Sequence, residues 1–165
     1  MIKITLPDGS IRNYVKPTSV FDIAKDISEG LARNVISAQF NEKTIEVNTV
    51  IKNDGNLILY TWKDVNGKKA FWHSSSHVLA QALQELYPGV KLTIGPAIEN
   101  GFYYDVDLGE NLISEKDLKN IEDRMLQIAR EKHDFKIRSV SKTEAIKKYS
   151  KAVSYTHLTL PTMFE

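Results

Sequence analysis

Two histidines, His73 and His77, are the side chains of this chain best suited to chemistry, and only three serines separate them. On a helix they would lie one turn apart, with Cβ atoms roughly 5–6 Å from each other. Such a pair has three possible roles: it holds a metal ion, it binds a phosphate or ribose hydroxyl and moves protons near neutral pH, or it is solvated. The spacing alone favours solvated imidazoles, because it often arises by chance. A metal site would need a further ligand, and no glutamate follows His73 as in the metal-binding H-E-x-x-H pattern.

The segment that must position these histidines, residues 73–87, has the pattern of an amphipathic helix. Its apolar residues recur with the helical period and predict one buried stripe, formed by Leu79, Ala82, Leu83 and Leu86. Pro88 and Gly89 then end the helix. On a wheel of about 100° per residue, the histidines fall beside Ala80 and Gln84, off this stripe. The small serines between them allow a ligand or another segment to approach the backbone.

The segments after this helix predict a hairpin and further helices. Residues 91–98 and 102–107 flank Asn100-Gly101, which is a strong hairpin signal. Asp105 and Asp107 share one face of the second strand, and we interpret them as exposed carboxylates rather than a metal or acid–base pair. A helix capped at Ser114 should bury Leu118, Ile121, Met125 and Ile128. Residues 135–140 resemble a strand, residues 143–149 a short helix, and His133 a surface residue.

Residues 1–62 predict a separate small domain. Alternating strands over residues 2–6 and 11–15 are joined by a turn at Asp8-Gly9 and followed by a helix, which Ser19 and Asp22 begin and Gly30 ends. Strands over 34–40, 44–47 and 57–62 complete a ubiquitin-like β-grasp. The polar residues 63–68 serve as a connector. We therefore predict an α+β chain with domains at 1–62 and 63–152, and a non-native tail at 153–165, whose sequence resembles a translated vector.

Composition excludes several classes of protein. The chain has 165 residues, a formal net charge of +1 and no cysteine, so disulfides and cysteine-based zinc sites are excluded within it. No run approaches the roughly 18 apolar residues that span a membrane. The first residues lack a signal-peptide pattern. A cytoplasmic protein with no membrane partner is the expectation.

Four motifs, in this order and spacing, give the chain a resemblance to the N-terminal part of threonyl-tRNA synthetases. They are residues 4–9 (Ile-Thr-Leu-Pro-Asp-Gly), the histidine helix, Ile94-Gly95-Pro96, and residues 99–105 (Glu-Asn-Gly-Phe-Tyr-Tyr-Asp). The resemblance implies a β-grasp TGS domain followed by the first part of an editing domain. In that family the editing domain hydrolyses serine wrongly attached to threonine tRNA. His73 and His77 match the first half of the editing motif, and Tyr104 is implied as a substrate contact.

The second half of the family's editing motif, Cys-x-x-x-His, is absent because this chain has no cysteine. The resemblance implies no cofactor and no metal ligand in this chain. It places ATP, magnesium, zinc and the homodimer contacts in a class II catalytic core that these residues do not include. The parent would be a threonine–tRNA ligase, and this fragment alone should be inactive. Two alternatives are a non-catalytic TGS-type module that binds RNA or protein, and a free-standing hydrolase like the alanyl editing domains.

Overall fold

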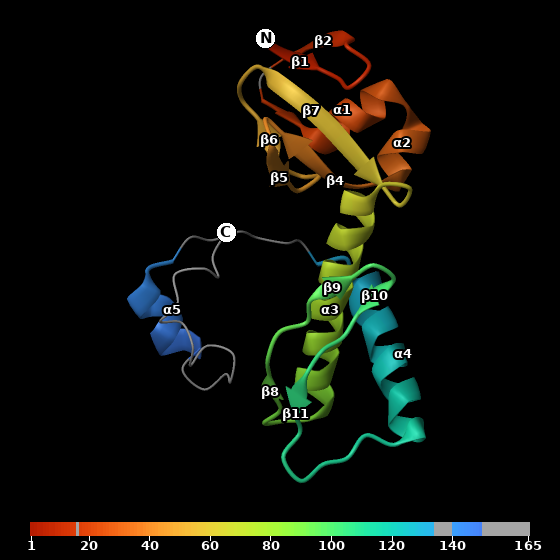
Figure 1. Ribbon diagram of the computed structural model, residues 1–165, viewed down its shortest axis with the longest axis vertical. Coiled ribbons are helices and arrows are strands. Elements are labelled where there is room, and N and C mark those ends of the chain that lie inside the picture. The colour runs from red at the N-terminus through yellow and green to blue at the C-terminus, as the bar shows by residue number, and fades with distance from the viewer. Residues whose placement is uncertain (16, 134–139, 150–165) are drawn as a thin grey trace. The chain divides into compact units, whose positions relative to one another are not determined.

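The computed structural model describes residues 1–15, 17–133 and 140–149, and it is an α+β chain as expected (Figure 1). The chain divides into two compact units, Met1–Trp72 and His73–Glu165. The predicted boundary between residues 62 and 63 concerns which segment folds alone, so it stays a prediction. A chain that ends near residue 64 and remains folded would support it.

The first unit is a five-stranded sheet covered on one face by a helix, which is the predicted β-grasp arrangement. The strand order is β2-β1-β7-β4-β5; β1 and β7 are parallel, and the other neighbours are antiparallel. The strands are β1 (Ile2–Thr5), β2 (Ile11–Tyr14), β4 (Val35–Phe40), β5 (Lys43–Ile45) and β7 (Gly55–Thr61). A further short pair joins β3 (Thr18–Ser19) to β6 (Val50–Ile51).

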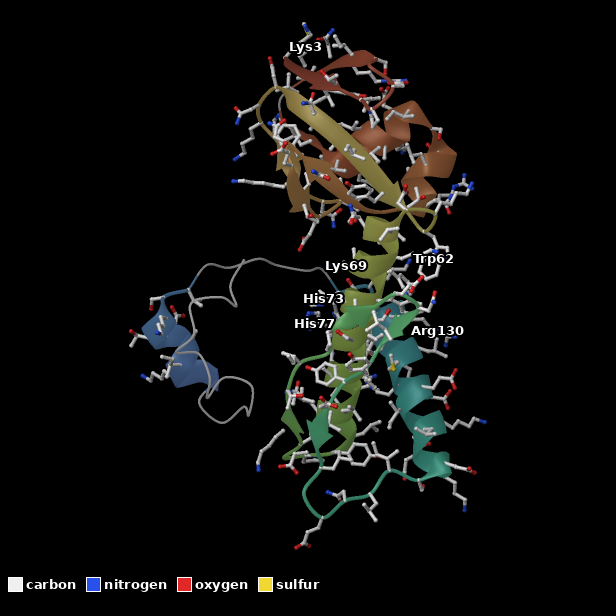
Figure 2. The ribbon with its side chains drawn as sticks, viewed as in Figure 1. Lys3, Trp62, Lys69, His73, His77 and Arg130 are labelled. Atoms are coloured by element: carbon white, nitrogen blue, oxygen red, sulfur yellow. The ribbon has the colours of Figure 1, made fainter. Side chains whose placement is uncertain are left out.

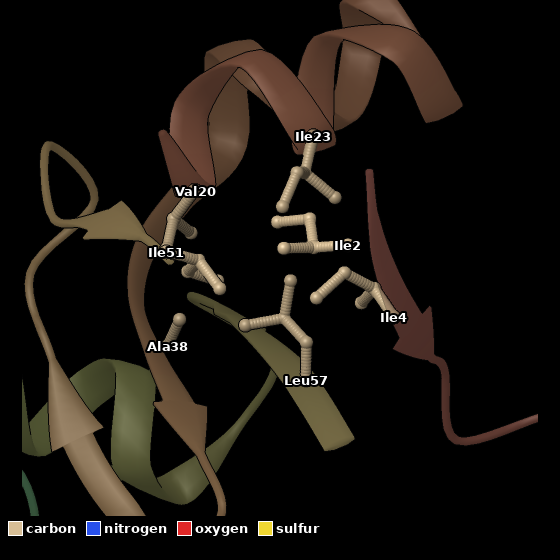
Figure 3. Close-up of a cluster of buried hydrophobic side chains, with 7 residues drawn as sticks. All are labelled: Ile2, Ile4, Val20, Ile23, Ala38, Ile51 and Leu57. Carbon is tan, nitrogen blue, oxygen red and sulfur yellow. The ribbon is translucent and has the colours of Figure 1, made fainter. Parts of the chain in front are cut away.

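The core of this unit lies between the sheet and α1 (Val20–Ile27). Every second side chain of a strand points toward the helix and packs there against the apolar face of α1, as Figure 3 shows. The buried members are Ile2, Ile4, Val20, Ile23, Ala38, Ile51 and Leu57. Ser19 begins α1 as predicted, because its hydroxyl accepts a hydrogen bond from the Asp22 amide at 3.1 Å.

The end of this helix differs from the prediction at Gly30. Helix α1 ends at Ile27, and Ser28 donates its backbone N–H to Ala24. The Ser28 hydroxyl then accepts from the Leu31 amide at 3.0 Å and begins α2 (Glu29–Asn34), which contains Gly30. A serine between two short helices satisfies backbone groups of both, so the glycine is not needed as a stop.

The predicted polar connector is largely helical. Helix α3 runs over Val65–Leu86, so it begins eight residues before His73. The Asp64 carbonyl accepts the first helical hydrogen bond, from Lys68, while its carboxylate accepts from the Thr61 amide and hydroxyl at 2.7 and 2.9 Å. A Cβ on Gly67 would lie 2.0 Å from the Thr61 carbonyl oxygen. Gly67 therefore marks a close approach of two segments rather than a turn.

The second unit packs helix α4 (Glu115–Glu131) and a split hairpin with the later turns of α3. On α3 the buried side chains are Ser76, Ala80, Ala82 and Leu83, whereas Leu86 is 38% exposed. The predicted stripe was therefore wrong at Leu86, because the buried face is turned toward the small residues Ser76 and Ala80. On α4, Ile121 and Ile128 are buried as predicted but Leu118 is 57% exposed.

The predicted hairpin is present, but its ladder is interrupted. Strand β9 (Ala97–Ile98) pairs with β10 (Gly101–Phe102), and β8 (Lys91–Leu92) pairs with β11 (Val106–Asp107). Between these two ladders, four residues on one side, 93–96, face three on the other, 103–105. The extra residue breaks the pairing in the manner of a β-bulge.

The remaining expectations divide between described and undescribed residues. Helix α5 (Lys142–Tyr149) confirms the predicted short helix. The capping pair at the start of α4 is also confirmed, since the Asp117 carboxylate accepts from the Ser114 amide at 2.8 Å. The predicted strand at 135–140 lies, except for Val140, outside the described residues, as does the tail at 153–165. Across the described ranges, no helix is long and apolar enough to cross a membrane.

Candidate functional site

The two histidines of α3 are in direct contact. Their Nε2 atoms lie 3.1 Å apart, and the rings meet edge to face with centroids 4.6 Å apart. Both residues are exposed, and Figure 2 shows them on successive turns of one side of α3. A hydrogen bond between these atoms needs one Nε2 that carries a proton and one that carries a lone pair. Two doubly protonated rings cannot form this bond, so the contact requires that at least one of the two Nε2 atoms is unprotonated.

Electrostatics favour a neutral ring at His77. Although His77 is exposed as a residue, protein atoms partly shield its ring from water, and this desolvation is the first cause that lowers its pKa from the ordinary value of 6.5. The second cause is the charge that His73 acquires when protonated. A neutral imidazole offers one unprotonated nitrogen at pH 7. His77 is consequently able to accept a proton from water or from a hydroxyl at neutral pH.

Next to the histidines, three residues pack together: Ser76, Gly95 and Tyr104. Ser76 is 1% exposed and donates its hydroxyl to the His73 carbonyl at 2.7 Å. A Cβ on Gly95 would lie 2.2 Å from Cδ2 of Tyr104 and 3.0 Å from Cβ of Ser76. Gly95 is therefore held between the tyrosine ring and the helix turn that carries His73 and His77. The glycine allows the hairpin to lie against the helix backbone at this turn.

Tyr104 is half-buried, and its hydroxyl donates to the Thr93 carbonyl at 3.4 Å. The structure thus joins Tyr104 to the histidine turn through Gly95. Its predicted role as a substrate contact stays a prediction. The serines between the histidines were expected to let a ligand or another segment approach the backbone, and the hairpin does so at Ser76. Gly95 was noted only within the family motif. A run of small residues facing a Gly-Pro pair is the signal that could have indicated their contact.

The carboxylates of the hairpin do not extend this site into a metal centre. Asp107 pairs with Lys91 at 3.1 Å, and its pKa is lowered first by the Gly109 amide and then by Lys91. Asp105 is exposed, and its carbonyl accepts from Thr93. Among the described residues, no group of three or more His, Cys, Asp or Glu side chains is arranged to hold a metal. His133 is an exposed residue that contacts Glu131 at 2.6 Å.

Comparisons with known proteins agree with the motifs. Residues 2–61 match the profile of the TGS domain family. The chain is 65% identical over 158 residues to the threonine–tRNA ligase of Flavobacterium johnsoniae, which covers 96% of this chain and 24% of that protein. It is 62% identical over 149 residues to that of Flavobacterium psychrophilum, and 47% identical over 150 residues to that of Porphyromonas gingivalis; each covers 90% of this chain and 23% of the relative.

The sequence belongs to the threonine–tRNA ligase family, in its N-terminal region. The resemblance seen in the motifs is thereby confirmed, and the β-grasp unit is a TGS domain. The chain spans 24% or less of the length of each of these ligases. In this threonine–tRNA ligase region, the roles of His73, His77 and Tyr104 stay predictions.

Proposed function

We propose that this chain supplies part of the tRNA-editing site of a threonine–tRNA ligase, in which His73 and His77 act in the hydrolysis of serine wrongly attached to threonine tRNA. The observation that supports it most directly is the 3.1 Å contact of the two Nε2 atoms on the exposed side of α3. Serine and threonine differ by one methyl group, which gives only ~1–3 kcal/mol of discrimination in a binding pocket. A second, hydrolytic site supplies the remaining selectivity.

In this proposal His77 is the proton acceptor. Its lowered pKa keeps the ring neutral at pH 7. A water proton moves to the ring nitrogen as the water oxygen attacks the seryl carbonyl carbon. The bond between that carbon and the ribose oxygen then breaks, and the ribose oxygen takes up the proton from the ring, which leaves His77 neutral again. The products are free serine and tRNA with its terminal hydroxyl restored.

His73 and Tyr104 position the substrate in the same scheme. His73 hydrogen-bonds a ribose hydroxyl of the 3′-terminal adenosine, one helix turn from the acceptor. Tyr104 is a further contact, because its ring is fixed against Gly95 beside this turn. Ser74, which is exposed between the two histidines, adds little side-chain bulk on the open side of the helix. A nucleotide is thus able to approach the backbone.

The wider protein is proposed to attach threonine to its tRNA with ATP, in the cytoplasm. ATP, magnesium, zinc and the homodimer contacts belong in this proposal to a catalytic core that these residues do not include. The second editing half, Cys-x-x-x-His, is also not supplied here, since the chain has no cysteine. We therefore propose that these residues alone have little or no editing activity.

The test uses a full-length ligase that contains these residues and measures deacylation of serine-charged threonine tRNA. His73→Ala and His77→Ala should each slow hydrolysis by roughly 10²–10⁴-fold if the ring takes part in proton transfer. His133→Ala is the matched control, because this exposed histidine pairs with Glu131 on the surface and has no role in the proposed site, so the rate should stay unchanged.

Folding should hardly change in either variant, since both side chains are exposed. Deacylation at the parent rate by both variants would reject the editing role. That result would instead favour a non-catalytic TGS-type module that binds RNA or protein. Zinc-dependent deacylation by the isolated chain would favour the alanyl-type hydrolase.

A further inference from the structure

Three aromatic rings meet where the TGS sheet ends and α3 begins. Trp62 follows β7, and Phe71 and Trp72 lie on the first turns of α3. The three rings pack edge to face, with centroids 5.1 Å apart for Trp62 and Phe71, 5.5 Å for Trp62 and Trp72, and 5.4 Å for Phe71 and Trp72. Trp62 nevertheless remains 47% exposed and Phe71 42% exposed. Two large aromatic side chains thus present ring surface to solvent in one place, where a flat ligand could stack on it.

A lysine completes this surface. Lys68 shares a helix face with Phe71 and Trp72 because it precedes them by three and four residues. Its ammonium nitrogen lies 6.0 Å from the centroid of the Trp62 ring. We call Trp62, Lys68, Phe71 and Trp72 the tryptophan–lysine patch. All four residues lie in the first compact unit.

One acidic residue, Asp64, lies close to the patch in the sequence, four residues before Lys68. The Asp64 carboxylate is engaged by the amide and hydroxyl of Thr61 at 2.7 and 2.9 Å. Lys63, directly after Trp62, is exposed and adds a second positive charge. Lys63 and Lys68 thus place two positive charges around Trp62, against the one negative charge of Asp64. An anionic ligand with flat rings matches such a surface.

The patch is also held in place before any ligand arrives. The hydrogen bonds of Asp64 to Thr61 fix the residue directly before Trp62. On the other side, Gly67 packs so tightly on the Thr61 carbonyl that a Cβ would lie 2.0 Å from its oxygen. Because the backbone next to Trp62 is already fixed, this residue should lose little conformational entropy when a ligand ring stacks on it.

We propose that the tryptophan–lysine patch binds unpaired nucleotides of RNA, with a base stacked on Trp62 and the adjoining phosphate paired with Lys68. Aromatic rings beside lysines are the usual means of binding single strands, because every base has a flat face and every nucleotide a negative charge. A wholly apolar protein partner would leave the Lys68 ammonium group without an anionic partner. The choice of RNA over DNA rests on the proposed function, but the patch does not involve His73 or His77.

The experiment uses the whole chain and its two tryptophans as reporters. Trp72→Phe keeps the aromatic packing and leaves Trp62 as the only tryptophan. This variant is titrated with an unstructured RNA of about ten nucleotides, a length that covers the site size of one small binding domain. Single-stranded DNA of the same sequence and a blunt RNA duplex are titrated in parallel. Stacking on Trp62 should quench its emission with the single-stranded RNA, and the duplex should have little effect.

Charge and stacking are then separated by variants, with binding followed by the anisotropy of labelled RNA. Trp62→Leu should weaken binding by about tenfold or more, and Lys68→Ala by several-fold with a weaker salt dependence. Lys69→Ala is the matched control: it is the next residue of α3, exposed, and Figure 2 shows it on the other side of the helix from Trp62. It should bind RNA like the parent. Lys68→Ala leaves the aromatic packing intact, so it keeps the test valid if Trp62→Leu unfolds.

Several outcomes would overturn the inference. They are emission of Trp62 that does not respond to single-stranded RNA, equal losses for Lys68→Ala and Lys69→Ala, and tighter binding to the duplex or to DNA. If the emission of Trp62 changes only with protein concentration, the patch serves self-association, and this result would also reject RNA binding. The editing proposal is tested separately. If deacylation needs His73 and His77 while the patch ignores RNA, only this inference fails, and the reverse result rejects only the editing role.

Discussion

Replacing Gly95 with alanine should destabilise the second unit, and the structure indicates by how much. A Cβ at this position would lie 2.2 and 2.6 Å from Cδ2 and Cε2 of Tyr104 and 3.0 Å from Cβ of Ser76. Carbon atoms pack at about 3.5–4.0 Å, so the tyrosine ring must move back by roughly 1 Å or more. Added carbons in a packed site typically cost about 1–3 kcal/mol. We expect Gly95→Ala to lower the free energy of unfolding by that amount.

A double-mutant cycle isolates the cause. Tyr104→Ala removes the ring, after which the new methyl group meets chiefly Ser76. In that background Gly95→Ala should be close to neutral, because the gain of about 0.4–1 kcal/mol from a less flexible unfolded chain offsets the remaining contact. The two changes should therefore be coupled by about 1–3 kcal/mol. Urea unfolding followed by circular dichroism measures each value, and amide exchange of α4 assigns it to this unit.

Gly30→Ala is the matched control for this experiment. Gly30 lies within α2, where a Cβ would meet nothing closer than the Ser28 hydroxyl at 3.9 Å. Alanine in a helix is better than glycine by about 0.5–1 kcal/mol, so this variant should be more stable than the parent. An equal loss for Gly95→Ala with and without the Tyr104 ring would refute the packing argument, as would a gain in stability.

Three further results are expected. Gly67→Ala should lower the free energy of unfolding by about 1–3 kcal/mol or more, although alanine usually stabilises a helix relative to glycine. The reason is that the new Cβ would lie 2.0 Å from a backbone oxygen, which cannot rotate aside. Urea unfolding followed by tryptophan emission measures this loss, and stability equal to that of the parent would contradict it. In an NMR titration, His77 should show a pKa below 6.5, and His73→Ala should raise that pKa only in part, because burial is the larger cause. The lowered pKa of His77 should not affect the stability of the protein above pH 6.5. As the pH falls from 6.5 toward the pKa of folded His77, the free energy of unfolding should decrease, since the unfolded chain binds the proton more tightly. Arg124→Met should reduce stability at neutral pH but not in acid, because a hydrogen bond from Arg124 is the largest cause of the lowered pKa of Glu85. The stability that this pair contributes is present above pH 4.5 and is lost as the pH falls through the pKa of folded Glu85. A stability difference that persists in strong acid would exclude this cause.

Local patterns alone were sufficient for much of the TGS unit. Alternating apolar residues identified the strands, because side chains of a strand point to opposite faces in turn. Ser19 with Asp22 and Ser114 with Asp117 identified two helix starts, since each bond joins residues three positions apart. The contact of His73 with His77 also follows from local geometry, because four residues make about one helix turn.

Packing between distant segments decided the rest. Gly67 lies in the segment predicted as a polar connector, yet it serves as a point of contact with Thr61, and a sequence pattern carries no sign of the segment that approaches it. Leu86 is as apolar as Leu83, but only Leu83 is buried, because the protected face of α3 is the one that carries Ser76 and Ala80. The lowered pKa of His77 likewise depends first on burial. Such properties arise from atoms brought together across the fold, so only the tertiary structure decided them.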